Sequence, residues 1–330
     1  MSSIPAPSTV KRGHENRLAH DFELACPDCR TPLAPSKPPD ASFRCQECSF
    51  ELRSENGIWQ AIPRERLLRY RQFIREYEYV RQAEGRGSSS AEYYLGLPFH
   101  DASGSNPGQW AIRARTFLCL RDQLLPSLQR PGSGLKILDL GAGNGWFSYR
   151  MALAGHRPAA VDLLTNDFDA LGAATIYQGH LAEPFPLYRA ELDKLPFAAA
   201  GFDFAVFNAS FHYAEDYTAT LGEALRCLRR GGMVVIADTP WYSREASGRA
   251  MVCERQQLFL DRFGFASDSI ASLEFLTDER LAKLEREFGI RWEIYHPSYG
   301  LRWALRPWMA RLRGRREPSQ FRIYAARLPQ

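Results

Sequence analysis

No long apolar run occurs in this sequence. A helix that crosses a bilayer needs about eighteen consecutive apolar residues, and no segment reaches that length. The first twenty residues also lack the apolar stretch of a secretory signal peptide, and no segment repeats along the chain. These absences predict a soluble cytoplasmic protein with no membrane span.

An excess of one charge is also missing, because 42 lysines and arginines nearly balance 38 aspartates and glutamates. A net charge of +4 and 45% hydrophobic residues are ordinary for a globular chain of 330 residues, which can form one large domain or two small ones. Six arginines nevertheless crowd one stretch of the last thirty residues: Arg302, Arg306, Arg311, Arg313, Arg315 and Arg316. Such a run usually marks a solvated face, although it could also meet phosphate or an anionic substrate.

The seven cysteines do not have the pattern of a small disulfide-rich domain. Three are isolated among apolar residues and are typical of small core side chains: Cys119, Cys227 and Cys253. The other four form two C-x-x-C pairs separated by fifteen residues, Cys26 with Cys29 and Cys45 with Cys48. Four thiolates at this spacing can converge on one zinc ion and leave no open position for water, which predicts a structural zinc. A redox dithiol is the alternative.

Composition divides the chain into four parts. Residues 1–20 are polar and are expected to form a disordered tail, and residues 21–63 are expected to form a zinc ribbon. Residues 64–130 are expected to form a helical linker that could cap a cofactor. Residues 131–330 form the predicted catalytic domain.

Apolar periodicity predicts two helices in the linker. Apolar and aromatic residues recur every three or four positions over Arg64–Glu84, which is typical of one amphipathic helix. A second helix is expected over Trp110–Leu128, after a break rich in glycine and serine.

Short apolar strands alternate with helices after residue 134, which favours an α/β fold with a parallel sheet. Strands are expected at Lys136–Leu140, Pro158–Leu163, Phe202–Asn208 and Met233–Asp238, with a helix over Gly145–Ala154. The third strand is poorly defined between Leu164 and Pro186. Near the end of the chain, Arg291–His296 and Gln320–Arg327 alternate like an antiparallel strand pair, and Leu301–Leu312 could form a helix between them.

A glycine-rich turn follows the first strand of this domain. Asp139 ends the strand, and Gly141, Gly143 and Gly145 lead into a helix, an arrangement that brings backbone N–H groups against a polar ligand. Asp162 closes the next strand, where a carboxylate can accept hydrogen bonds from ribose hydroxyls. Dinucleotide and S-adenosylmethionine (SAM) sites share this geometry. A dinucleotide site would have glycine or alanine where this chain has Trp146, which favours SAM.

Residues 134–240 resemble the class I SAM-dependent methyltransferases, particularly the broad type 11 group. Ile137–Gly145 is similar to the first motif of that family, and Leu225–Gly232 is similar to the segment that leads into its fifth strand. Glu191–Phe197 looks like its acidic-x-x-x-Leu-Pro-Phe segment, whose carboxylate neighbours adenine, with Asp193 as the fallback for Glu191. The resemblance implies a Rossmann-like sheet, SAM as cofactor and these cofactor-binding residues: Asp139, Gly141, Gly143, Gly145, Asp162, Leu163, Glu191, Leu192 and Asn208.

Methyl transfer from SAM chiefly requires the alignment of donor and acceptor, so no catalytic residue is obligatory. His212 is the candidate base, because it follows the fourth strand in the loop that the resemblance places facing the acceptor; a hydrogen-bonded loop histidine is the alternative. Aromatic residues and an arginine that precede the glycine turn could enclose SAM or could simply pack the linker: Tyr77, Arg81, Tyr93 and Tyr94.

The acceptor is open at this level. A small molecule of a biosynthetic pathway is preferred, and RNA or protein is second. A zinc ribbon before a SAM domain is similar to the arrangement in bacterial ribosomal RNA guanine methyltransferases, but the basic and acidic residues around this ribbon balance, so no footprint for RNA is evident. A SAM-binding or zinc-ribbon interaction protein without turnover is another alternative, and an NAD-linked oxidoreductase is the least favoured. The oligomeric state is not predicted.

Overall fold

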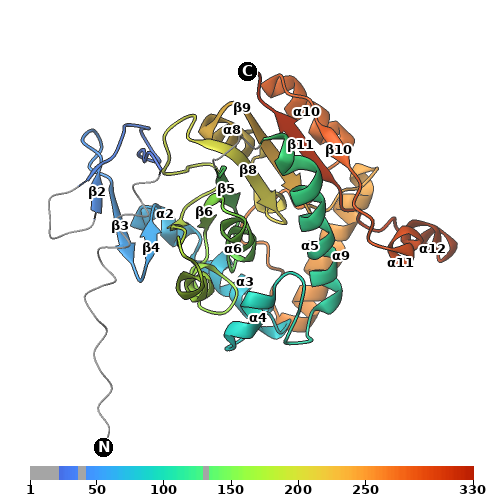
Figure 1. The fold of residues 1–330 in the computed structure, drawn as a ribbon. Helices are drawn as coiled ribbons and strands as arrows, with labels where there is room; N and C mark the ends of the chain where they lie inside the picture. The colour runs from blue at the N-terminus through green and yellow to red at the C-terminus, as the bar shows by residue number, and fades with distance from the viewer. Residues whose placement is uncertain (1–21, 36–41, 129–133) are drawn as a thin grey trace, which may run out of the picture.

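The computed structural model describes residues 22–35, 42–128 and 134–330, so the tail predicted for residues 1–20 lies outside the described part of the chain. One mixed sheet runs through the molecule in the order β1-β2-β3-β4-β7-β6-β5-β8-β9-β11-β10 (Figure 1). Its strands are β1 (Ala34–Pro35), β2 (Ser42–Arg44), β3 (Glu51–Glu55), β4 (Ile58–Gln60), β5 (Lys136–Leu140), β6 (Arg157–Asp162), β7 (Leu187–Arg189), β8 (Phe202–Asn208), β9 (Leu228–Ala237), β10 (Glu293–Tyr295) and β11 (Ile323–Arg327).

The five central strands, β7-β6-β5-β8-β9, pair in parallel. This part of the sheet has the predicted Rossmann-like arrangement. The C-terminal pair, β10 and β11, is antiparallel as predicted, and β11 lies antiparallel to β9. The poorly defined third strand is β7, which has only three residues and follows Pro184 and Pro186.

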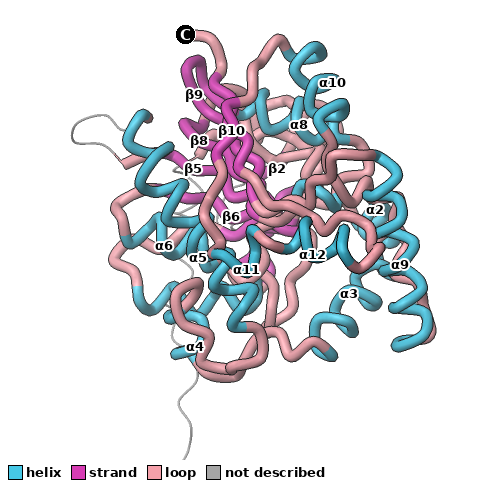
Figure 2. Tube along the Cα trace, turned by 90° about the vertical axis from the view of Figure 1, so that its right-hand side faces the viewer, coloured by secondary structure: helices cyan, strands magenta, loops and turns pink. Residues whose placement is uncertain are grey.

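Helices pack on both faces of the sheet (Figure 2). They are α2 (Arg64–Arg69), α3 (Arg71–Ala83), α4 (Ala91–Gly96), α5 (Pro107–Cys119), α6 (Trp146–Leu153), α7 (Leu171–Ala174), α8 (Tyr217–Cys227), α9 (Glu245–Phe263), α10 (Asp278–Phe288), α11 (Leu301–Ala304) and α12 (Arg306–Leu312). Apolar side chains of α8 and α10 share one core cluster, and those of α5 and α6 share the other. Strand β5 supplies both, because Leu138 faces the first cluster and Ile137 the second, as the two-residue strand period requires.

The N-terminal module is continuous with the central sheet. Strand β4 pairs in parallel with β7, and Leu24 forms an isolated bridge with Phe197. Phe22 also stacks on Phe202 with ring centroids 5.0 Å apart. The cysteine-bearing segment therefore extends the central sheet and shares its core, whatever domain boundary is drawn near residue 63.

The linker helices differ from the predicted ones in detail. The single helix expected over Arg64–Glu84 is divided at Tyr70 into α2 and α3. Tyr70 is buried at the junction, where its hydroxyl donates to Glu191. Helix α5 begins at Pro107, because proline suits the first turn of a helix, and its path continues through a π-helical turn over Leu120–Leu124. Among the described residues, no helix is both long enough and apolar enough to cross a bilayer.

Helix α6 offers a test of the packing beneath the glycine turn. Met151 is fully buried in the second core cluster, whereas Leu153 on the same helix is 52% exposed. We expect Met151→Ala to lower the free energy of unfolding by about 2–5 kcal/mol, because it leaves a cavity against the sheet. Leu153→Ala is the matched control and should change stability by less than about 0.5 kcal/mol. Urea unfolding followed by circular dichroism measures both, and equal effects would contradict the packing described.

Candidate active site

A cavity of about 370 Å³ lies at the carboxyl ends of the parallel strands. Its wall contains residues that follow four of them: Gly141–Asn144 after β5, Leu163 and Leu164 after β6, Ala190–Lys194 after β7, and Ala209 and Ser210 after β8. Ligands of open α/β sheets bind at this edge. Eight of the nine residues predicted to bind the cofactor line the cavity, and the exception is Gly145.

The glycine turn adopts the left-handed backbone that its composition predicts. Gly141, Gly143 and Gly145 have φ values of +73°, +56° and +74°. A side chain on Gly141 would overlap that of Ser210 at the end of β8. A Cβ on Gly145 would lie 2.8 Å from the Cβ of Ala174. Gly141 and Gly143 line the cavity. Gly145 does not line it, and its missing side chain lets Ala174 pack against the turn.

Two buried carboxylates hold the turn against the sheet. Asp162 accepts the Gly143 N–H at 2.8 Å and the Leu164 N–H at 2.8 Å. Asp139 accepts the Ser148 hydroxyl at 2.7 Å. Burial raises the pKa of Asp139 to about 7, and the neighbouring charge of Asp162 adds to the effect. Burial also raises the pKa of Asp162 above its ordinary value, while its backbone hydrogen bonds oppose the shift.

Glu191 is tied to the linker and, through it, to the cysteine-bearing module. The Tyr70 hydroxyl donates to Glu191 at 3.0 Å, and Arg66 Nε lies 2.8 Å from its other oxygen. Arg66 also pairs with Asp28, which stands between Cys26 and Cys29. A chain of charges thus connects the cysteine loop to the predicted adenine end of the cavity.

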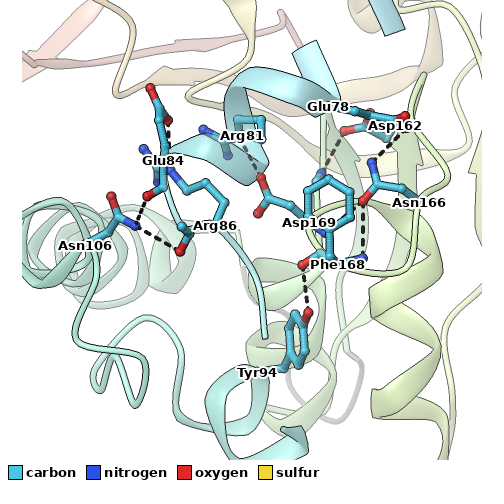
Figure 3. Close-up of polar contacts among 12 residues, drawn as sticks. Glu78, Arg81, Glu84, Arg86, Tyr94, Asn106, Asp162, Asn166, Phe168 and Asp169 are labelled. Carbon is cyan, nitrogen blue, oxygen red and sulfur yellow. Dashed lines mark hydrogen bonds and ion pairs between the residues drawn. The ribbon is translucent and has the colours of Figure 1, made fainter. Parts of the chain in front are cut away.

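Helix α3, which belongs to the linker predicted to cap a cofactor, forms part of the cavity wall. Tyr77 and Arg81 line it, and Arg81 Nε lies 2.6 Å from Asp169 (Figure 3). Tyr94 and its neighbour Tyr93 are fully buried and do not line the cavity. The Tyr94 hydroxyl instead donates to the Phe168 carbonyl at 2.7 Å, which anchors the loop that carries Asp169 (Figure 3).

His212 lies in the loop after β8, as predicted, but it is not among the residues that line the cavity. Burial and then the positive charges of Arg255, Arg113 and Arg81 lower its pKa to about 3, so the imidazole is neutral at neutral pH. Its Nδ1 is buried and has no hydrogen-bond partner among the described residues. Its neighbour Tyr213 does line the cavity.

Arg113 lines the cavity, although sequence reasoning did not single it out. Burial lowers its pKa, and it has no ion pair with another residue in the described part of the chain. A usable signal was present, because Arg113 interrupts the buried face formed by Trp110, Phe117 and Leu120. A charged residue on a core-facing helix stripe often serves a site.

The four predicted metal ligands converge on one point. All their sulfur atoms lie within 4.8 Å of one another. Cys26 Sγ is 3.4 Å from Cys48 Sγ, and Cys29 Sγ is 3.3 Å from Cys45 Sγ. Four sulfurs bound to one zinc at about 2.3 Å would be about 3.8 Å apart. None of the four cysteines forms a disulfide, so the donor set and its spacing fit a tetrahedral zinc.

Comparison with known proteins places the central part of the chain in a known family. Residues 138–236 match the methyltransferase domain family. A malonyl-[acyl-carrier protein] O-methyltransferase of Erwinia billingiae is 32% identical over 161 residues, which are 48% of this chain and 52% of that protein. A ubiquinone/menaquinone biosynthesis C-methyltransferase of Rhizobium etli is 28% identical over 121 residues, which are 36% of this chain and 47% of that protein. The chain thus matches about half the length of these relatives.

Among solved structures, the phosphoethanolamine N-methyltransferase 2 of Haemonchus contortus, in complex with phosphomonomethylethanolamine and S-adenosylhomocysteine, shares the fold. The alignment has a TM-score of 0.50 and 17% identity, and it covers 79% of this chain and 60% of that one. Fold, cavity and family match together show that the chain carries a SAM-dependent methyltransferase domain with a Rossmann-like sheet.

The surroundings of His212 predict a specific pH dependence of stability. Between about pH 6.5 and pH 3, His212 is protonated in the unfolded chain but neutral in the folded protein. As the pH falls through this window, wild-type protein should therefore lose stability relative to His212→Gln, by about 1 kcal/mol per pH unit. Above pH 6.5 the difference should be constant. Urea unfolding of both proteins across this pH range measures it, and parallel stability curves would show that His212 is not shielded from protons.

Proposed function

We propose that the protein transfers the methyl group of SAM to a small-molecule acceptor bound in the same cavity. The observation that carries this proposal is the convergence of residues from four strand ends on one cavity, within a chain whose central part matches a methyltransferase family. SAM supplies an already activated methyl group. The protein therefore needs to hold donor and acceptor aligned and to keep water away.

The residues around the cavity suit the parts of SAM. Asp162 would hold the ribose hydroxyls, and Glu191 would lie beside adenine, with Leu163 and Leu192 as apolar walls. The methionine part would lie along Gly141 and Gly143, supported from below by Asp139 and Gly145. Asn208 would face its ammonium group, because the buried Oδ1 of Asn208 has no hydrogen-bond partner among the described residues. An ammonium donor would satisfy that oxygen.

A small acceptor is preferred over RNA for two reasons. The cavity is lined by α2, α3, α5 and the loops at the strand ends, and its volume of about 370 Å³ suits a compact substrate. The cations near the cysteine cluster are also engaged, because Arg30 pairs with Glu223 while Arg44 and Arg53 pair with Glu51. They are less available to an RNA backbone. The two relatives named above act, by name, on a carrier-protein-linked malonyl group and in quinone biosynthesis, and neither substrate is RNA.

One residue of the cavity wall is a candidate for a role beyond cofactor binding. Arg113 is a cation in the cavity wall and would meet a carboxylate, either that of methionine or one on the acceptor. His212, the predicted base, does not line the cavity, and the low pKa of its buried imidazole makes it a weak proton acceptor at neutral pH, so the base role is not assigned to it. The second candidate function is that of a SAM-binding protein without turnover. It would be favoured if no RNA, protein or metabolite fraction of a cell extract accepted a methyl group from SAM.

We also propose a structural zinc at Cys26, Cys29, Cys45 and Cys48. The sulfur spacing and the absence of disulfides among these residues support it. Zinc-binding thiolates persist in a reducing compartment, so the proposal keeps the predicted cytoplasmic location.

Isothermal titration with SAM, S-adenosylhomocysteine and NAD tests the cofactor site. We expect SAM and S-adenosylhomocysteine to bind and NAD not to bind. Glu191→Gln should weaken SAM about tenfold, because it removes a charged acceptor beside adenine. The control is Glu183→Gln, which changes an exposed glutamate outside the cavity and should bind SAM as the wild type does. Binding of NAD alone would refute the proposal.

The Asp28–Arg66–Glu191 chain predicts that the zinc loop supports cofactor binding. Asp28→Asn should weaken SAM about fivefold while zinc stays bound, because Arg66 loses one of its two carboxylate partners. Removal of zinc with a chelator should weaken SAM at least as much. The matched control is Glu47→Gln, an exposed residue of the second cysteine pair. Metal analysis and titration with SAM are the measurements, and unchanged SAM affinity in both the variant and the zinc-free protein would contradict the coupling.

A further inference from the structure

The connection between β10 and β11 carries an apolar stripe that faces solvent. Helices α11 and α12, together with Leu305 between them, present apolar residues at the spacing of one helix face: Leu301, Leu305, Trp308, Met309 and Leu312. These side chains are 82%, 52%, 60%, 37% and 66% exposed, in the same order. In a globular protein such a stripe normally faces the core. In this protein, none of the described residues packs over the stripe and buries it.

The opposite side of the segment is anchored to the body of the protein. Trp303 stacks on Phe321, which precedes β11, with ring centroids 5.3 Å apart. Arg316 Nε lies 2.7 Å from Glu254 on α9. The exposed stripe is therefore the outer side of a docked element. Figure 2 shows α11 and α12 at the front of the molecule, and Figure 1 shows them far from the N-terminal strands.

The segment is also strongly basic. No acidic residue occurs from Ile294 to Arg316, whereas six arginines do. Four of these arginines are exposed and have no ion pair with any described residue: Arg302, Arg311, Arg313 and Arg315. A short amphipathic element that combines exposed leucine, methionine and tryptophan with unpaired arginines has the composition of helices that lie in the interface of an anionic bilayer.

We propose that α11 and α12 dock the protein on the surface of an anionic phospholipid bilayer. The apolar stripe inserts at the boundary between headgroups and acyl chains, and the arginines contact lipid phosphates. A second copy of the chain fits less well, because two such patches would bring their arginines together. An RNA would leave Leu301, Leu305 and Leu312 without stacking partners, since bases stack on aromatic and guanidinium groups.

Co-sedimentation of the full-length protein with vesicles tests the proposal. One set of vesicles contains phosphatidylcholine alone, and the other contains equal parts of phosphatidylcholine and phosphatidylglycerol. We expect binding to the anionic vesicles only, weakened by added salt. Leu305→Ser/Trp308→Ser should lower the partition coefficient by about tenfold or more. Each exposed arginine replaced by glutamine, beginning with Arg311 and Arg313, should lower it about fivefold.

Leu153→Ser is the matched control, because it makes the same kind of change at a 52% exposed leucine on α6. It should bind the anionic vesicles as the wild type does. Thermal melting and SAM titration of each variant confirm that it is folded. Failure of the wild type to bind anionic vesicles, or equal binding by the folded stripe variant, would overturn the proposal. Retention on RNA or on an acidic protein without vesicle binding would overturn it as well.

Discussion

The hydrogen bond from the Gly143 N–H to the Asp162 carboxylate joins the two strand ends on which the candidate site is built. It fixes the glycine turn after β5 against the end of β6, in a backbone conformation that glycine adopts without strain. The same carboxylate accepts the Leu164 N–H and so orders the start of the next loop. One buried aspartate thereby shapes the floor of the cavity through hydrogen bonds within the protein. Such preorganisation reduces the cost of ordering the site around a cofactor.

Helices α2 and α3, which lie outside the central sheet, form ion pairs with residues around the cavity. Arg81 on α3 pairs with Asp169 on one side, and Arg66 on α2 pairs with Glu191 on the other. Because Arg66 also pairs with Asp28, the cysteine loop contacts a residue of the cavity wall. This arrangement gives the proposed zinc a physical connection to the methyltransferase site. A detached recognition module would have none.

The central strands could be predicted because each is a short apolar run between turn residues. The glycine turn could be predicted because three alternating glycines between a strand and a helix are typical of a turn that brings the backbone close to a ligand. The cysteine cluster followed from spacing alone. The pairing of β4 with β7 could not be predicted, since strands of three residues carry no readable period and their partners are distant in sequence. Helix α9 was missed because its face toward the protein is small and polar, with Ser247 and Gly248 as its buried residues.

Helix α10 had a readable signal that was overlooked, namely the Thr277 cap followed by Asp278 and Glu279 in the first turn. The candidate site also contains some residues that could be predicted from the sequence and others that could not. Residues on strand ends were found from motifs, whereas Arg66, Tyr70 and Arg113 reach the cavity only through the tertiary packing of the linker helices. The cavity's cofactor end and two residues of its cap, Tyr77 and Arg81, could therefore be outlined in advance, whereas the contacts of Arg66 and Tyr70 with Glu191 could not.

A crystal structure of the full chain with S-adenosylhomocysteine tests the central claim most directly. The account predicts that the ribose hydroxyls lie within hydrogen-bond distance of Asp162, with adenine beside Glu191 and Leu192 and the amino acid part along Gly141 and Gly143. A ligand bound elsewhere, or one whose ribose does not reach Asp162, would contradict it.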